Sequence, residues 1–175
     1  MTHPDLVNLQ TRARVTELAA RLDAGIVAID GPSGAGKSTI ADLLVADLRA
    51  RGVGVTLVRT DDFATWDDPV AWWPELETDV LHPFTRRRDY RYRPRVWQNG
   101  VPAPGPRVWI EWQPLLIIEG VSSARRRIAD RLSHALAGAR AGLDQHLVAA
   151  AGRQQPQQRA QVGAAVAAGR QGQQA

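Results

Sequence analysis

Residues 26–39 read IVAIDGPSGAGKST, and this stretch decides the fold. Its first residues, Ile26 to Ile29, are all apolar, which is typical of a strand buried on both faces of a parallel sheet. A glycine-rich loop follows at once, and residues 39–51 then place apolar side chains on one helical face until Gly52 ends the run. A buried strand, a tight loop and an amphipathic helix in this order predict an α/β fold built on a parallel sheet.

The loop satisfies the pattern G-x-x-x-x-G-K-[ST] through Gly31, Gly36, Lys37 and Ser38. Its glycines let backbone N–H groups point at phosphate oxygens, and the helix that begins at Lys37 directs the positive end of its dipole at the same anion. We expect Lys37 to reach the β- and γ-phosphates and the Ser38 hydroxyl to bind magnesium. The alternative is a chance match in a glycine-rich turn, but the flanking strand and helix are the context that the motif requires. The predicted ligand is ATP with magnesium, bound by Gly31, Ser33, Gly34, Ala35, Gly36, Lys37, Ser38 and Thr39.

Two further apolar runs predict more strands of the same sheet. Residues 53–60 are rich in β-branched side chains, and residues 115–118 are wholly apolar and end at Glu119-Gly120. Residues 9–23 have near-helical apolar spacing, and residues 122–134 read as another helix. Together with the loop, these elements predict a P-loop NTPase fold with a parallel sheet in three layers.

Residues 61–112 differ in character from the rest of the chain. The 6 tryptophans, 2 tyrosines and 2 phenylalanines of the protein all lie in this segment, among many prolines and arginines. This composition is typical of an irregular insertion with short helices or a hairpin rather than a regular strand–helix–strand unit. Aromatic faces can stack on an acceptor base, but for each tryptophan we favour a place in a secondary core. The tryptophans are Trp66, Trp72, Trp73, Trp97, Trp109 and Trp112.

The sequence after His134 is rich in alanine, glutamine and glycine. We recognise no apolar strand there, so we predict a core over residues 1–134 and a tail over 135–175, with a sheet that is incomplete at the C-terminal end. Residues 135–151 have a composition compatible with a helix, and residues 152–175 are of low complexity and are expected to be disordered. A shifted reading frame would explain such a tail.

Charge and composition exclude several classes of function. The net charge is +4, but Lys37 is the only lysine and the arginines gather in short runs at 86–88 and 125–127, so we do not predict nucleic-acid binding. The chain has no cysteine and therefore no disulfide framework or thiolate zinc site. It has no apolar run long enough for a membrane span and no signal-peptide pattern at its start, so we expect a cytoplasmic protein without a membrane partner.

Three segments in order give the chain a family resemblance. They are residues 30–39, the run Thr60-Asp61-Asp62-Phe63 after the second strand, and Ile117-Ile118-Glu119-Gly120. Over residues 25 to about 134 the chain resembles the uridine kinase and phosphoribulokinase group of P-loop kinases. Ala64 stands where this group keeps a tyrosine, and the arginine-bearing lid of the group has no counterpart that we can recognise.

The resemblance implies roles for three acidic residues. Asp61 matches the aspartate that faces the acceptor hydroxyl and accepts its proton, which with Lys37 makes the predicted catalytic pair. Asp62 is adjacent and stays open as the base, and a turn or helix cap is the bland alternative for both. Glu119 is implied as the second magnesium-positioning residue beside Ser38, with a buried carboxylate satisfied by backbone amides as its alternative. On the same resemblance, the implied acceptor-binding residues are Asp61, Phe63, His82, Tyr92 and Arg93.

These inferences lead to a kinase as the expected function. The expected reaction is in-line transfer of the γ-phosphoryl group of ATP to a hydroxyl of a small molecule, most simply a uridine- or cytidine-like nucleoside. The alternative is a truncated protein of the same fold that binds ATP without turnover. A GTPase is disfavoured because its Asn-Lys-x-Asp motif needs a second lysine. The oligomeric state is left open.

Overall fold

A computed structural model describes residues 3–65, 72–137, 147 and 148, and a mostly parallel sheet lies at its centre. Within these residues the sheet has the order β2-β7-β1-β8-β9. Its strands are β1 (Gly25–Asp30), β2 (Val55–Arg59), β7 (Leu115–Glu119), β8 (His134–Ala137) and β9 (Leu147–Val148). The first four in this order run parallel, and β9 is antiparallel to β8. The three strands expected from the apolar runs are therefore confirmed.

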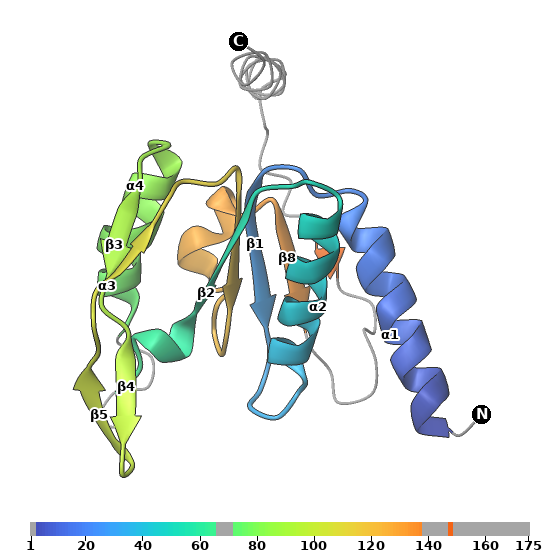
Figure 1. Cartoon of the computed structure of the whole chain (residues 1–175), viewed down its shortest axis with the longest axis horizontal. Coiled ribbons are helices and arrows are strands. Elements are labelled where there is room, and N and C mark those ends of the chain that lie inside the picture. The colour runs from blue at the N-terminus through green and yellow to red at the C-terminus, as the bar shows by residue number, and fades with distance from the viewer. Residues whose placement is uncertain (1–2, 66–71, 138–146, 149–175) are drawn as a thin grey trace.

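The register of the parallel strands brings their carboxyl ends to one edge. β7 lies between β1 and β2, so that Glu119 is the partner of Ile29 on one side and of Arg59 on the other. Ligands of open α/β sheets bind beyond this edge, where the loops leave the strands. The loop after β1 and the short 3₁₀-helix η1 (Thr60–Asp62) after β2 both lie there, at the lower edge of the sheet in Figure 1.

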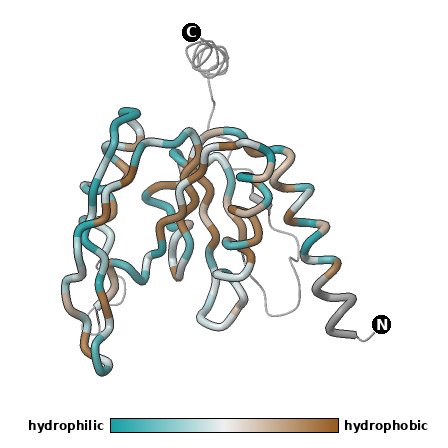
Figure 2. Tube along the Cα trace, in the orientation of Figure 1, coloured by the Kyte–Doolittle hydropathy of each residue, from teal (hydrophilic) through white to brown (hydrophobic). Residues whose placement is uncertain are grey.

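Two helices cover one face of the sheet (Figure 1). They are α1 (His3–Ala19) and α2 (Lys37–Ala50). Side chains of both helices pack on alternate residues of the strands, such as Val27, Leu115 and Ile117. This alternation follows from the two-residue period of a strand, and Figure 2 shows the most hydrophobic chain in the central strands. No helix in the described ranges is long and apolar enough to cross a membrane.

The aromatic-rich segment covers the opposite face. A nearly continuous helical run consists of α3 (Trp73–Leu76), the π-helical η2 (Glu77–Leu81) and α4 (His82–Thr85). Two small antiparallel pairs follow, β3 (Tyr90–Tyr92) with β6 (Val108–Ile110) and β4 (Arg95–Gln98) with β5 (Val101–Pro104). The segment packs on the sheet residues Ile26, Ala28 and Ile118. The sequence predicted short helices or a hairpin in this segment, and its described residues contain both.

The tight hairpin of this segment had a sequence signal that we did not use. β4 and β5 are joined by Asn99 at φ 51° and Gly100 at φ 79°, with Gln98 paired to Val101. Positive φ at both central residues is the turn that matches the twist of a hairpin, and Asn-Gly is its favoured sequence. The dipeptide alone would have located these two strands.

The C-terminal expectations need correction. β8 begins at His134 and pairs with β1, so the sheet continues past the boundary that we placed at residue 134. Residues 122–134 contain only the short 3₁₀-helix η3 (Arg126–Arg131), and residues 135–137 are strand rather than helix. We missed β8 because its run of His134, alanines and one leucine lacks the β-branched residues that mark a strand. The predicted tail over 152–175 lies outside the described residues.

Candidate nucleotide and acceptor site

The loop between β1 and α2 has the conformation that its glycines allow. Gly34 has φ 75° and Gly36 has φ 79°, both in the left-handed region that side chains disfavour. Gly36 caps α2, which starts at Lys37, so the backbone N–H groups of the first helical turn lie beside the loop. The predicted nucleotide-binding residues thus form one connection at the carboxyl edge of the sheet, and Ser33, Ser38 and Thr39 are exposed there.

Lys37 is the buried cation of this loop. The residue is only 7% exposed, and its Nζ donates a hydrogen bond of 3.0 Å to the backbone carbonyl of Pro32. The ammonium group therefore lies across the loop, held by a carbonyl at the loop's start. A charge kept in this position is partly stripped of water, and its attraction to a phosphate is stronger than at an exposed site.

Glu119 lies next to the first turn of α2. It is 5% exposed, and the Ser38 hydroxyl donates a hydrogen bond of 3.3 Å to its Oε2. Burial raises the pKa of Glu119, and the nearby charges of Lys37 and Arg59 act against this rise. The sequence left open whether backbone amides satisfy this carboxylate. The structure gives it a hydroxyl and cationic side chains as partners.

Ser38 and Glu119 fit a magnesium ion held jointly with phosphate. Magnesium prefers oxygen ligands and usually keeps only one or two protein ligands, with phosphates and water completing an octahedron. In the described ranges no group of three or more His, Cys, Asp or Glu side chains is placed to hold a metal by itself. A metal bound between Ser38 and Glu119 would accordingly need the oxygens of a bound nucleotide.

Asp30 fixes the loop to the neighbouring strand connection, which sequence reasoning missed. Its Oδ1 accepts hydrogen bonds from the backbone N–H groups of Gly31 at 2.6 Å and Ser122 at 2.8 Å, and its Oδ2 accepts one from Ala124 at 3.0 Å. Ser122 has φ 63°, a conformation that is unfavourable for a residue with a Cβ atom. The carboxylate therefore holds a strained connection after β7 against the start of the phosphate loop.

The neighbouring aspartates after β2 have different environments. Asp62 is half-buried, and the Tyr92 hydroxyl donates a hydrogen bond of 2.8 Å to its Oδ2. Burial raises the pKa of Asp62, and this hydrogen bond opposes the rise. Asp61 is exposed, in the same short turn after β2. Asp62 is thus engaged with the aromatic-rich segment, whereas the side chain of Asp61 is open to solvent.

The predicted acceptor-binding residues do not form one group. Phe63 is 2% exposed and Tyr92 is 6% exposed, and their rings stack with centroids 5.1 Å apart. His82 lies 3.7 Å from Glu77 through its Nε2, in a cluster that also includes Arg131. Arg93 is exposed on the outer side of the segment. Of this set, Tyr92 is the one joined to the aspartates by a hydrogen bond.

The tryptophans divide between core and surface. Trp72 and Trp73 are each 3% exposed and belong to the core, whereas Trp97 and Trp109 are 43% and 64% exposed. The Arg125 guanidinium lies 5.1 Å from the ring centroids of both Trp72 and Trp73, a distance at which cation–π attraction acts. Trp112 packs on Phe84, and Trp66 lies outside the described residues. The secondary-core interpretation therefore holds for part of the set.

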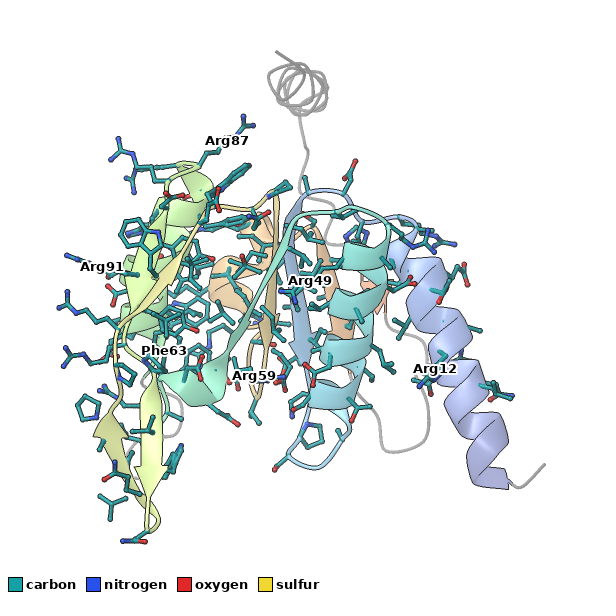
Figure 3. All side chains as sticks on the ribbon, viewed as in Figure 1. Arg12, Arg49, Arg59, Phe63, Arg87 and Arg91 are labelled. Atoms are coloured by element: carbon teal, nitrogen blue, oxygen red, sulfur yellow. The ribbon has the colours of Figure 1, made fainter. Side chains whose placement is uncertain are left out.

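Arg59 is a cation at the site that sequence reasoning did not identify. It is the last residue of β2, and its Nε lies 3.5 Å from Glu119 Oε2 while its Nη2 lies 2.7 Å from Asp42 Oδ1. Figure 3 shows Arg59 at the edge of the sheet between η1 and the phosphate loop, whereas Arg87 and Arg91 point outward from the aromatic-rich segment. An arginine at the end of a strand carries no motif, and only the strand order reveals its neighbour.

Solved structures with a similar arrangement exist. The chain is similar to the structure of a possible uridine kinase from Bacillus stearothermophilus, with a TM-score of 0.60 and 17% identity over 72% of this chain and 79% of that chain. It is also similar to a putative fructose transport system kinase from a Silicibacter species, with a TM-score of 0.48 and 24% identity over 73% of each chain. No family model and no curated protein sequence matches. The first similarity and the strand order together confirm that the chain has the α/β fold of the P-loop NTPases.

Proposed function

We propose that this protein is an ATP-dependent kinase that phosphorylates a hydroxyl group of a small molecule. The main support is the contact between Ser38 and Glu119 beside the buried Lys37, at the carboxyl ends of β1 and β7. A phosphate loop needs only Ser38 and Lys37 of these three residues to bind a triphosphate. A buried carboxylate facing the loop serine adds the oxygen that positions a magnesium ion for phosphoryl transfer.

In this proposal each residue has a defined task. The loop amides and Lys37 hold the β- and γ-phosphates, and magnesium, held by Ser38 and Glu119, would neutralise charge on the bridging and terminal oxygens. Asp61 accepts the proton of the acceptor hydroxyl as its oxygen forms a bond to the γ-phosphorus. The bond between that phosphorus and the β–γ bridging oxygen breaks, and ADP leaves with the electron pair. The products are ADP and a phosphate monoester.

Asp61 is the better candidate for the base because Asp62 has another task. Asp62 accepts a hydrogen bond from the hydroxyl of Tyr92 and so anchors η1 to the buried aromatic side chains. Asp61 lies in the same short turn and is exposed. A base must reach the acceptor proton, and the exposure of Asp61 supports its choice over Asp62.

For the acceptor we propose a nucleoside of the uridine or cytidine type. The resemblance of the Thr60-Asp61-Asp62-Phe63 segment supports this choice, as does the possible uridine kinase among the similar structures. Phe63 and Tyr92 would then pack under the acceptor site without contacting the acceptor, since their rings are buried. The competing proposal is a protein of the same fold that binds ATP without turnover.

A coupled assay of ADP release with a panel of acceptors separates the two proposals. We expect magnesium-dependent ADP formation with a pyrimidine nucleoside, together with the matching nucleoside monophosphate in the product mixture. Asp61→Asn should reduce the rate by about 100-fold or more without changing ATP binding. Asp62→Asn is the matched comparison and should reduce the rate much less. ATP binding without phosphorylation of any nucleoside or small alcohol would support the non-catalytic alternative.

A further inference from the structure

Arg59 stands between two carboxylates at the edge of the sheet. The register that pairs Arg59 with Glu119 brings its guanidinium to the buried end of the site, 3.5 Å from Glu119 Oε2. Its other contact is Asp42 on α2, at 2.7 Å. The three side chains differ in exposure, at 6% for Glu119, 40% for Arg59 and 63% for Asp42. Arg59 thus links a buried anion to an exposed one.

The same oxygen of Glu119 has two partners. Oε2 accepts the hydrogen bond of Ser38 and is also the atom nearest to Arg59. A buried carboxylate is costly without a positive partner, and Arg59 supplies one together with the charge of Lys37. A magnesium ion between Ser38 and Glu119 would approach this oxygen and meet the guanidinium beside it. The arginine and the metal therefore compete for one acceptor.

We propose that Arg59 is a positioning residue that holds the Glu119 carboxylate beside Ser38 and lowers the affinity of the site for magnesium. This inference rests on the proposed function, because it takes Ser38 and Glu119 as the metal-positioning pair. Arg59 holds the Glu119 carboxylate in its orientation beside Ser38 until the metal–nucleotide complex arrives. Asp42 then draws the guanidinium away from Glu119, so the exposed aspartate favours metal binding although it lies outside the pair.

The charges fix the sign of each effect. A positive group within several ångströms of a dication site repels the dication, so its removal should tighten metal binding. Asp42 and Glu119 are the two carboxylates that Arg59 contacts here. Without Asp42, the guanidinium should lie closer to Glu119, and metal binding should weaken. A residue that merely supported the fold would not give opposite effects for these two substitutions. Both effects should shrink at high salt because Arg59 and Asp42 are partly exposed.

The test is a magnesium titration of nucleotide binding in the full chain, with a non-hydrolysable ATP analogue. We expect Arg59→Gln to lower the magnesium concentration at half-saturation by a factor of about three to ten. Asp42→Asn should raise it by about twofold or more, and Arg59→Lys should stay close to the unchanged protein. Arg51→Gln is the control, since it breaks an ion pair with Asp47 at the other end of α2. Binding of the same analogue in EDTA should be nearly equal in all variants.

Three outcomes overturn the inference. A higher magnesium concentration at half-saturation in Arg59→Gln than in the unchanged protein would show that the arginine assists the metal. Weaker binding in EDTA would show that the guanidinium contacts the nucleotide itself. Equal magnesium titration curves for Arg59→Gln and Arg51→Gln would show that the contact between Arg59 and Glu119 has no specific effect and that only the loss of a surface charge counts. The readout needs no acceptor, so an unchanged chain that binds the analogue but phosphorylates nothing refutes the kinase proposal alone, and one that does not bind it refutes both.

Discussion

The sheet with its phosphate loop and the described residues of the aromatic-rich segment, 61–65 and 72–112, are packed in different ways. In the sheet, consecutive residues of β1 and β7 point to opposite faces, and every residue of β7 is buried. In the aromatic-rich segment, elements of three to five residues are held by rings such as Phe63, Trp73 and Tyr92. The difference teaches that regular strands position the predicted nucleotide-binding residues, whereas irregular aromatic packing positions Asp62, next to the proposed base.

Glycine substitutions give the largest contrast between these regions. Gly120 has φ 147°, and a Cβ atom there would lie 1.8 Å from Thr60 Oγ1, where β7 meets η1. Gly120→Ala should destabilise the fold by about 3 kcal/mol or more, because the overlap adds to the backbone strain. Gly100→Ala in the hairpin should cost only about 1 kcal/mol, because a Cβ atom there meets nothing within 4 Å at φ 79°. Urea unfolding of both variants measures the difference, and equal midpoints would contradict it.

The second contrast concerns ligand binding rather than stability. Lys37→Ala should weaken ATP binding by about 100-fold or more, because it removes a buried cation from the phosphate loop. Calorimetric titration with ATP and magnesium measures the loss. Arg49→Ala is the control, since Arg49 is exposed in the last turn of the same helix. Unchanged ATP affinity in Lys37→Ala would refute the assignment of the loop.

The sequence predicted the first region better because short-range patterns determine it. An apolar run, a glycine motif and a helical period locate β1, the loop and α2 without any knowledge of the tertiary structure. The apolar run over residues 115–118 located the strand that ends at Glu119, and the family resemblance implied the role of this residue. β8 escaped because it is stabilised by pairing with β1 more than by its own composition, and pairing partners far apart in sequence leave little local trace.

The second region was predicted only as a kind of structure, for a physical reason. Rings such as Tyr92 and Trp72 fill space from many directions, so their order in the sequence does not say which will be buried. The contacts of Asp62 with Tyr92 and of Arg59 with Glu119 join residues that only the tertiary fold brings together. For the same reason the sequence favoured Asp61 as the base only by resemblance and left Asp62 open, and the structure shows that the two differ in burial.

Tyr92→Phe tests how much the contact between the Tyr92 hydroxyl and Asp62 contributes to stability. The tyrosine hydroxyl donates to an ionised carboxylate, so its loss should cost about 1.5 kcal/mol of stability at pH 7. It should also raise the already elevated pKa of Asp62, because this hydrogen bond favours the charged form. The cost of the substitution should therefore shrink as the pH falls and Asp62 becomes protonated. Thermal unfolding between pH 4 and pH 8 measures this trend, and a pH-independent difference would show that the effect does not depend on the charge of Asp62.

The smallest expected effect lies at Glu77, where η2 of the aromatic-rich segment contacts η3. This carboxylate accepts a hydrogen bond of 2.9 Å from Arg131, which lies in η3, and His82 and Arg127 lie within 4.0 Å of it. The Arg131 bond is the main cause that lowers the pKa of Glu77 below its usual value of 4.5. Glu77→Gln should cost only about 0.5 kcal/mol at pH 7, since Arg127 and Arg131 are partly exposed and solvent screens the pairs.

The pH dependence of that small effect has a definite sign. A carboxyl group with a lowered folded-state pKa contributes stability above its unfolded pKa and loses that contribution as the pH falls through the folded value. The difference between Glu77→Gln and the unchanged protein should therefore be full near pH 7 and vanish well below pH 4.5. Glu111→Gln, at an exposed carboxylate of the same segment, is the control for the loss of one acidic side chain. If the Glu77→Gln deficit persisted at low pH or in high salt, buried contacts rather than ion pairs would join η2 to η3.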